Sequence, residues 1–341
     1  MEVSRESIFI SALRAFCNAF FAFVGVIVGL VIIALILFGS FFKSATSHGL
    51  HTEMIFEANA DLSDDPLPST VPVIMRINIH GPIMPPNLTY NDIEVQLLDA
   101  QKGILKDGRI KGILLHMNTP GGSTTDAFAI YQMLMDYKKK FKVPIYAFTN
   151  GLCASAGVYI TSVADKSFAT DVSVIGSVGV ILGPMFNYVG LMEKLGIKAK
   201  TISDGKNKDF LSPYRPWVEG EDKSLYAIAK SQYEHFVDLV TKSRPRLDKE
   251  KLINVYGAQV FSASVSQEYG FIDDGASTYN LALGELVKAS GIEGDYQVIR
   301  LRPKRGLFSK IFEKRTIVEK VTSLFKSDET TDPVLYLYET P

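Results

Sequence analysis

Residues 144–160, PIYAFTNGLCASAGVYI, join a strand-like beginning to a turn of very small residues. The first part, 144–148, is apolar and aromatic, as is typical of a buried strand. Small residues at 154–157 surround Ser155, and an apolar run follows them. A hydroxyl in such surroundings either lies where two backbones pack closely or must be reached by another molecule.

The same order of elements occurs upstream. A strand over 71–78 and helical spacing over 91–106 come first. A strand over 110–117, the glycine turn 118–122 and a helix over about 125–141 follow. This alternation predicts an α/β fold with a largely parallel sheet. Because catalytic groups in such sheets gather where strands end and helices begin, both small-residue turns are candidate sites.

The N-terminal segment is apolar enough to cross a membrane. Residues 15–42 contain 28 residues without a charge, and about 20 apolar residues suffice for a spanning helix. The bulky end of the run argues against a cleaved signal peptide, which usually ends in small residues. We therefore predict a transmembrane anchor over 16–42, with a cleaved signal or a buried core helix as the alternatives.

Charges near the anchor indicate its orientation. Arg5 and Arg14 precede it and favour a cytoplasmic segment over 1–15, although Lys43 follows at once. We expect a single-pass protein of the inner (cytoplasmic) membrane with its catalytic domain on the outer, periplasmic side. The lipid bilayer is then a partner.

The rest of the chain divides into three parts. Residues 43–70 are polar and predict a linker, residues 71–300 predict one domain, and residues 301–341 form a basic amphipathic tail. For the tail, packing on its own domain or on a neighbouring subunit is favoured over lying on an anionic membrane. Residues 334–338, VLYLY, could add a strand to a sheet edge.

Composition excludes several classes of function. The net charge is −1, with 36 basic and 37 acidic residues, so no overall field attracts nucleic acid. The two cysteines lie far apart in sequence, and the five histidines show no metal-binding spacing. We expect no disulfide, metal or cofactor.

Ser155 is a candidate nucleophile. A serine needs a base to take its proton and N–H donors where the oxyanion forms. The N–H of Ala156, at a helix start, and one from Gly121 or Gly122 could serve as donors. The alternative is that 154–157 merely allow a helix to pack tightly on a sheet.

Five blocks of residues follow one another in a set order. They are Asn118-Thr119-Pro120-Gly121-Gly122-Ser123, Ala154-Ser155-Ala156-Gly157-Val158-Tyr159, Ile175-Gly176-Ser177-Val178-Gly179-Val180, 203–213, and 257–261 with 268–273. Together these blocks resemble the signal peptide peptidase A family of membrane-anchored serine proteases, whose relatives of the same fold are the Clp protease and the crotonases. The resemblance implies stacked ββα units of the Clp protease/crotonase kind after the N-terminal transmembrane helix.

The resemblance also implies catalytic roles. Ser155 matches the family's nucleophile, and Lys208, in a Lys-Asp-x-x-Ser-Pro block, matches its general base, with Lys206 as the rival. Ser177 matches a serine that hydrogen-bonds the lysine amine, and Gly122 and Ala156 match the oxyanion donors. Since a free lysine has a pKa of about 10.4 and burial lowers it by up to ~3–5 units, a lysine base must be largely desolvated.

Some features depart from the family pattern. Ala156 stands where the family usually has glycine, which keeps the N–H, and Thr119 replaces a serine. The chain also carries one copy of the motif set, whereas longer members carry two. A single-copy member would have to assemble several subunits to enclose a chamber, so we expect a homo-oligomer.

We therefore expect a membrane-anchored serine endopeptidase with a Ser-Lys dyad. It would cleave extended apolar peptides, such as signal peptide remnants, through an acyl-enzyme. One rival is a non-catalytic membrane scaffold that binds peptides. Another is a crotonase-like acyl-CoA enzyme, which is disfavoured because residues 151–164 contain no acidic side chain for acid–base work.

Overall fold

The computed structural model describes residues 8–45, 51–63 and 65–304. Contacts divide the chain into two units, with the boundary after Leu50. The first unit contains one long helix, and the second contains the α/β domain.

The first unit is helix α1, Ile8–Ala45. Its segment Leu13–Ile33 has 21 residues with a mean hydropathy of 2.6, and no residue of its most apolar stretch is buried. It is long and apolar enough to cross a bilayer, and in the described residues it is the only helix of this kind. The predicted N-terminal apolar helix is therefore confirmed as a candidate span.

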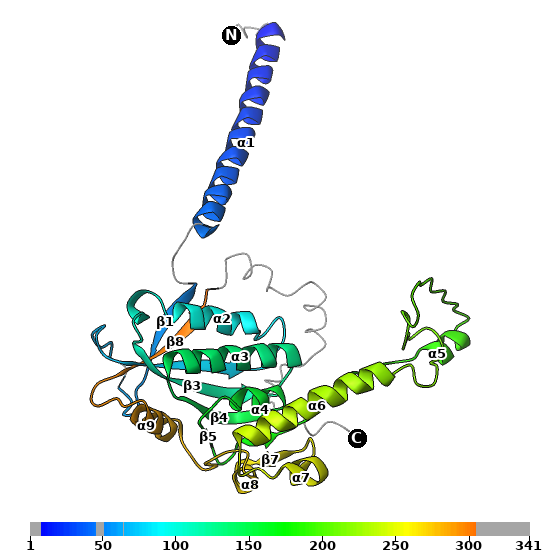
Figure 1. Cartoon of the computed structure of the whole chain (residues 1–341). Coiled ribbons are helices and arrows are strands. Elements are labelled where there is room, and N and C mark those ends of the chain that lie inside the picture. Colours follow the sequence, from blue (N-terminus) through cyan, green and yellow to red (C-terminus); the bar gives the residue numbers. More distant parts are fainter. Residues whose placement is uncertain (1–7, 46–50, 64, 305–341) are drawn as a thin grey trace. The chain divides into compact units, whose positions relative to one another are not determined.

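The second unit is built on a mixed, mostly parallel sheet (Figure 1). Its strand order is β1-β8-β2-β3-β4-β6-β7, and β5 pairs with β4. The β2, β3 and β4 strands are parallel, whereas the β1/β8 and β6/β7 pairs are antiparallel. The strands are β1 Thr52–Glu57, β2 Val73–His80, β3 Ile110–Thr119, β4 Ile145–Ala154, β5 Lys166–Ala169, β6 Val174–Gly176, β7 Val260–Ser262 and β8 Gln297–Pro303. The predicted α/β class is confirmed.

Helices cover both faces of this sheet. One face packs against α2 (Tyr90–Asp99), α3 (Thr124–Phe141) and α4 (Ala156–Thr161), and the other packs against α9 (Tyr279–Ala289). Alternate β2 residues enter the two cores, so Met75 and Ile77 face the first and Ile74 the second. Burial on both faces explains why the central strands are apolar almost throughout.

Strands β1 and β8 differ from the sequence-based expectation. β1 lies within the stretch 43–70, which was expected to be a linker, and β8 extends past residue 300, where the tail was expected to begin. The sequence did not predict these two strands, because both contain charged residues that form ion pairs with each other across the β1/β8 ladder. Glu53 bonds Arg302 at 2.7 Å and Glu57 bonds Arg300 at 2.6 Å. The rest of the predicted tail, including 334–338, lies outside the described residues.

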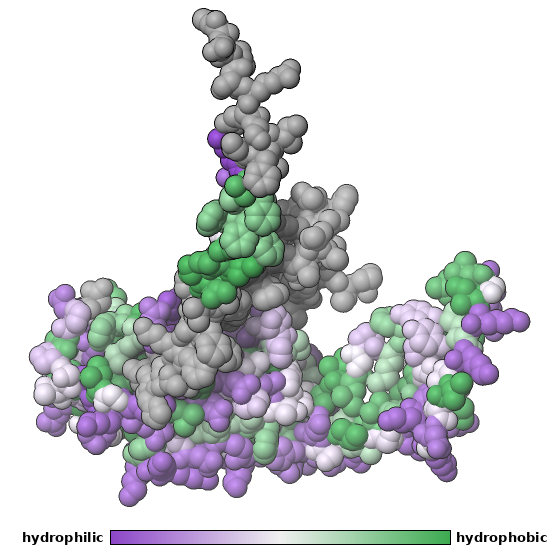
Figure 2. All heavy atoms as spheres, turned by 90° about the horizontal axis from the view of Figure 1, so that it is seen from above, coloured by the Kyte–Doolittle hydropathy of each residue, from purple (hydrophilic) through white to green (hydrophobic). Residues whose placement is uncertain are grey.

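Residues 181–222, here called the arm, extend from the sheet domain. Figure 1 shows α5 (Val189–Lys194) at the far end of α6 (Lys223–Ser243), away from the sheet. Many apolar side chains of the arm are exposed, and Ile202 is 87% exposed. Figure 2 shows green apolar groups gathered there, at the right of the view. An apolar surface of this kind is typical of an interaction surface.

Shorter elements complete the second unit. They are the 3-10 turn Gly103–Leu105, α7 Lys249–Lys251, the π-helical turn Leu252–Tyr256 and α8 Ala263–Tyr269. Only the C-terminal half of α6 joins the core, through residues such as Phe236, Val237 and Val240. The arm is thus attached through a helix that is anchored at one end.

Candidate active site

Ser155 occupies the sharp turn between β4 and α4. Its φ of 51° and ψ of −117° are unusual for a residue with a side chain, and such conformations cost about 1–3 kcal/mol. The turn is held by the Ser155 N–H, which donates to the Gly176 carbonyl at 3.0 Å. The hydroxyl does not cap α4. The turn therefore places this oxygen at the end of β4, where it does not cap the helix that follows.

The glycine turn after β3 lies directly against Ser155. A Cβ added to Gly121 would come within 2.8 Å of the Ser155 Cβ, and one added to Gly122 would overlap the Ile83 carbonyl. Both glycines also have positive φ, so only glycine permits this approach. Within the described residues, the N–H groups of Gly122 and Ala156 have no hydrogen-bond partner. The two predicted oxyanion donors are thus both available.

The threonine that replaces the family serine has a local role. Thr119 Oγ1 donates to the Gly81 carbonyl at 2.7 Å and accepts from the Gly121 N–H at 3.1 Å. It therefore fixes the start of the glycine turn. The alanine at 156 is buried, and it is the first residue of α4, directly after Ser155.

Ser177 lies beside Ser155, directly after the end of the neighbouring strand β6. Ala154 pairs with Gly176 in the β4/β6 ladder, so each serine directly follows one member of the pair. Ser177 also has a positive φ, 58°, and its N–H donates to the Gln259 carbonyl at 2.7 Å. The two serines share the lining of an open cavity of about 500 Å³. The structure thus brings together four of the five predicted site residues: Ser155, Ser177, Gly122 and Ala156.

A second cavity beside Ser155, of about 370 Å³, is here called the aromatic cavity. Phe128 of α3, Tyr159 of α4 and His235 and Phe236 of α6 line it. The Tyr159 hydroxyl and His235 Nε2 are hydrogen-bonded at 2.9 Å. Burial raises the pKa of Tyr159 to about 12, so its phenol is neutral at physiological pH. His235 was not expected here, because it comes from α6, about 80 residues along the chain.

The predicted base, Lys208, is not brought to Ser155 within one chain. It lies on the arm, its side chain is exposed, and so is that of its rival Lys206. Among the described residues, no lysine lines either cavity that Ser155 lines. One chain therefore brings together the predicted nucleophile and the predicted oxyanion donors, but not the desolvated amine that the sequence led us to expect.

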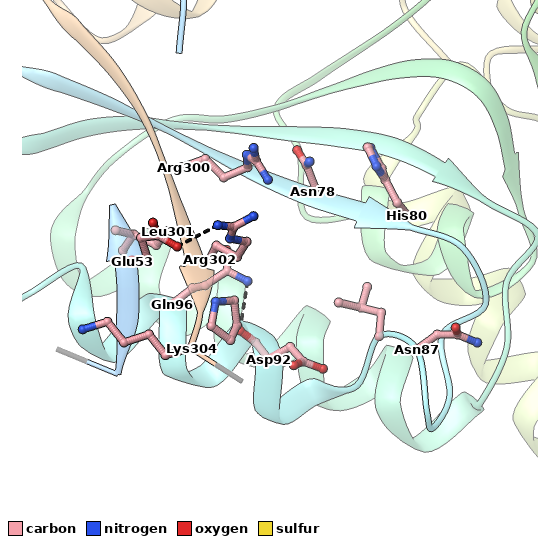
Figure 3. A pocket seen from close by; sticks show the side chains of 12 residues that line it. Glu53, Asn78, His80, Asn87, Asp92, Gln96, Arg300, Leu301, Arg302 and Lys304 are labelled. Atoms are coloured by element: carbon pink, nitrogen blue, oxygen red, sulfur yellow. Dashed lines mark hydrogen bonds and ion pairs between the residues drawn. The ribbon is translucent and has the colours of Figure 1, made fainter. Parts of the chain in front are cut away.

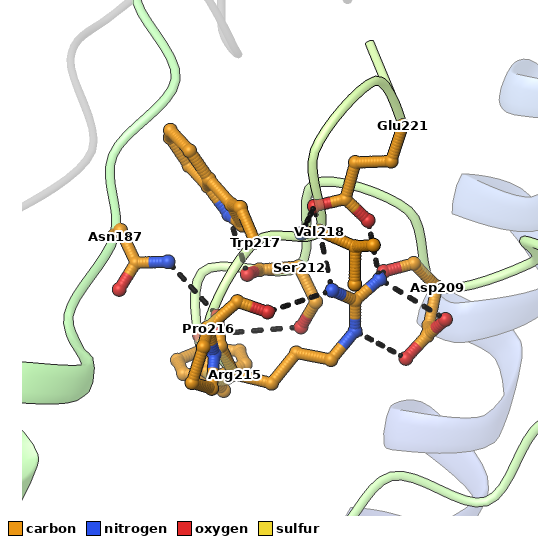
Figure 4. Close-up of polar contacts among 9 residues, drawn as sticks. Asn187, Asp209, Ser212, Arg215, Pro216, Trp217, Val218 and Glu221 are labelled. Carbon is orange, nitrogen blue, oxygen red and sulfur yellow. Dashed lines mark hydrogen bonds and ion pairs between the residues drawn. The ribbon is translucent and has the colours of Figure 1, made fainter.

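A polar network fixes the arm segment that follows Lys208 (Figure 4). The Arg215 guanidinium bonds the Asp209 carboxylate at 2.8 Å and the Glu221 carboxylate at 2.7 Å. These hydrogen bonds hold the pKa of both carboxyls below their usual range. The Trp217 indole N–H donates to the Ser212 carbonyl at 2.9 Å. Lys208 thus sits at the edge of an ordered, charge-paired loop.

A cysteine and a further cavity lie outside this arrangement. Cys153 is fully buried behind Ser155, and burial raises its pKa to about 12, so it is not a thiolate nucleophile. A larger cavity of about 610 Å³ lies between α2 and the diverging ends of β2 and β8 (Figure 3). Two of its cations are engaged in ion pairs, Arg302 with Glu53 and Arg300 with Glu57, and Ser155 does not line it.

A serine on a strained strand-to-helix turn, beside two free N–H donors, is the arrangement of a serine hydrolase. The comparisons agree. The model of peptidase family S49 matches residues 137–293. A protein of Enterococcus faecium named as a candidate signal peptide peptidase SppA is 32% identical over 70% of this chain and 72% of its own length.

More distant relatives carry related names. A candidate protease of Methanocaldococcus jannaschii is 31% identical over 63% of this chain and 67% of its own length. The chloroplastic serine protease SPPA of Arabidopsis thaliana is 26% identical over 66% of this chain and 32% of its own length. The chain belongs to peptidase family S49, the family of the SppA signal peptide peptidases, and is a serine-type peptidase.

Proposed function

We propose that this peptidase is a membrane-anchored endopeptidase with a Ser-Lys dyad that degrades signal peptide remnants and other extended apolar peptides. The observation that supports this most directly is the Ser155 turn, which keeps an unbonded hydroxyl beside the N–H groups of Gly122 and Ala156. The apolar lining of the aromatic cavity suits an apolar substrate residue.

Acylation begins with attack of the Ser155 oxygen on the substrate carbonyl carbon. The Lys208 amine takes the hydroxyl proton, and the N–H groups of Gly122 and Ala156 bind the oxyanion. When the C–N bond breaks, the ammonium returns that proton to the leaving amine. Water then attacks the ester through the same base, and proton transfer back to the Ser155 oxygen frees the acid product. Ser177 accepts a hydrogen bond from the amine and orients it.

The lysine reaches Ser155 from a neighbouring subunit in this proposal. A lysine acts as a base only when neutral, and removal from water favours the neutral form. Lys208 is exposed in the single chain, but it lies on an arm whose apolar surface would be buried in a homo-oligomer. Assembly would therefore both cover the arm and complete the dyad.

The N-terminal helix gives the proposed location. The span Leu13–Ile33 would anchor the protein in the inner membrane, and Arg5 before it and Arg14 at its start would keep the N-terminus cytoplasmic. The catalytic domain would then face the periplasmic side. Signal peptide remnants left in the membrane are substrates that such an anchored enzyme could reach.

The test is labelling of the full-length protein in detergent with a serine-reactive peptide phosphonate, together with cleavage of a synthetic signal peptide. We expect modification of Ser155 and loss of both activities in Ser155→Ala. Failure of Ser155 to react would favour a non-catalytic peptide-binding scaffold. Binding of coenzyme A in calorimetry would favour the crotonase-like alternative, although neither cavity at Ser155 is lined by an acidic residue of the described chain.

A further inference from the structure

The aromatic cavity differs from a plain apolar pocket in one respect. Gln232 of α6 lines it, and the Gln232 side-chain oxygen Oε1 is buried without any hydrogen-bond partner in the part of the chain described. A buried acceptor without a donor is costly, and such atoms in native proteins call for an explanation. A donor supplied by a bound molecule would satisfy it.

In the described residues, no other group of the cavity donates a hydrogen bond to that oxygen. The Tyr159 hydroxyl is engaged with His235 Nε2 at 2.9 Å. Each of these two rings also packs against a phenylalanine. The ring centroid of His235 lies 6.2 Å from that of Phe128, and the centroid of Tyr159 lies 5.3 Å from that of Phe236. The cavity is therefore an aromatic box with one unsatisfied acceptor.

Charge further restricts what the cavity can accept. No Asp, Glu, Lys or Arg of the described residues lines it. A charged side chain bound there would lose its hydration without gaining an ionic partner. A small side chain would leave the rings of Phe128 and Phe236 without contacts and so lose most of the binding energy. A large neutral aromatic side chain fits both conditions.

We propose that the aromatic cavity selects a substrate residue with an aromatic body and a terminal hydrogen-bond donor, tyrosine above all, and that Gln232 recognises the donor. This inference rests on the proposed function, because it assigns the cavity to the substrate residue next to the bond that Ser155 attacks. The hydroxyl of a bound tyrosine donates to Gln232 Oε1. A bound phenylalanine fills the same space but leaves that oxygen without a partner.

The experiment measures kcat/KM of the full-length protein in detergent for matched fluorogenic peptides with Tyr, Phe, Ala, Lys or Glu before the cleaved bond. Tyr should exceed Phe by about 5- to 100-fold, the range expected for filling a buried, unsatisfied acceptor. Both aromatic peptides should exceed Ala by at least ~10-fold, because the lost apolar contact is larger than one methylene. Lys and Glu peptides should be the poorest substrates.

Two variants separate the contributions. Gln232→Leu should bring the Tyr/Phe ratio close to one, whereas Phe128→Ala should reduce the rates for both aromatic peptides and keep the ratio. Gln101→Leu is the matched control, because Gln101 lines neither cavity at Ser155, and it should preserve the parent's ratio.

The outcomes distinguish this inference from the proposed function. Ser155-dependent cleavage with equal rates for Tyr, Phe and Ala would overturn the inference and leave the proposed function intact. A Tyr/Phe ratio that survives Gln232→Leu would remove Gln232 from the recognition. If no peptide is cleaved and no phosphonate modifies Ser155, the proposed function fails and the inference fails with it.

Discussion

The serine region and the arm are built in opposite ways. Ser155 lies between a central strand and a buried helix, and its turn is fixed by Gly121, Gly122 and Gly176. Lys208 lies on an exposed segment with an apolar surface, attached through one end of α6. A nucleophile must be preorganised before the substrate arrives. In the proposed function the base is supplied through assembly and stays inactive until the subunits meet, so we expect oligomerisation to control activity.

The largest effect should come from a substitution in the serine region. Ser155→Ala removes the proposed nucleophile, and we expect kcat to fall by about 10³- to 10⁶-fold. The fold should persist, because the Ser155 hydroxyl makes no hydrogen bond in the described structure. Peptide cleavage and circular dichroism measure the two effects. A variant that cleaves as fast as the parent would exclude Ser155.

The lysines of the arm are tested next. Lys208→Ala should reduce kcat by at least ~10³-fold if its amine is the base, whereas Lys206→Ala, two residues away, should change it little. Steady-state cleavage of a signal peptide by both variants decides between them. The reverse pattern would assign the base to Lys206, and full activity of both would exclude a base from this segment.

Mixing the two inactive variants tests whether the base acts between subunits. Ser155→Ala and Lys208→Ala proteins, co-assembled at equal amounts, should regain up to about a quarter of the parent's activity, because random assembly pairs an intact serine with an intact lysine at that fraction of sites. The same mixture kept as separate oligomers is the control. Absence of any recovery after proven subunit exchange would mean that serine and lysine come from one chain.

The comparison also explains what the sequence could predict. The Ser155 and glycine turns were predictable because local small residues, strand ends and helix starts all occur together there. The central strands were predictable because both their faces are apolar. Strands β1 and β8 were not predictable, because their pairing joins residues more than 240 positions apart. Their charged residues, which are unusual in a strand pattern, form cross-strand ion pairs that only the folded chain brings together. His235 and Gln232 were missed for a similar reason, since only tertiary packing of α6 brings them to Ser155.

A substitution on the arm should affect assembly more than folding. Ile202→Glu places a charge on a side chain that is 87% exposed in the single chain, so the monomer should tolerate it. In an oligomer that buries the arm, the same charge would be desolvated without a partner, and the assembly should dissociate. Sedimentation velocity of the full-length protein in detergent measures this, with Lys200→Glu, also exposed on the arm, as the control. An unchanged sedimentation coefficient would show that Ile202 is not in the interface.

The smallest effect should come from the polar network behind Lys208. Arg215→Gln removes the ion pairs to Asp209 and Glu221. The Glu221 side chain is 8% exposed, but those of Arg215 and Asp209 are 29% and 31% exposed, and ion pairs that water reaches contribute little to stability. We expect a nearly unchanged melting temperature and a fall in kcat of less than ~10-fold, because the loop that carries Lys208 becomes less ordered while its chemistry is kept. Cleavage kinetics and thermal unfolding, measured together, separate these two effects. Arg215→Lys keeps one charge but not the two-sided contact, so its kcat should fall between those of the parent and Arg215→Gln. An equal loss in both variants would mean that the forked geometry of the guanidinium matters, whereas no loss in either would show that the position of Lys208 is set by the neighbouring subunit.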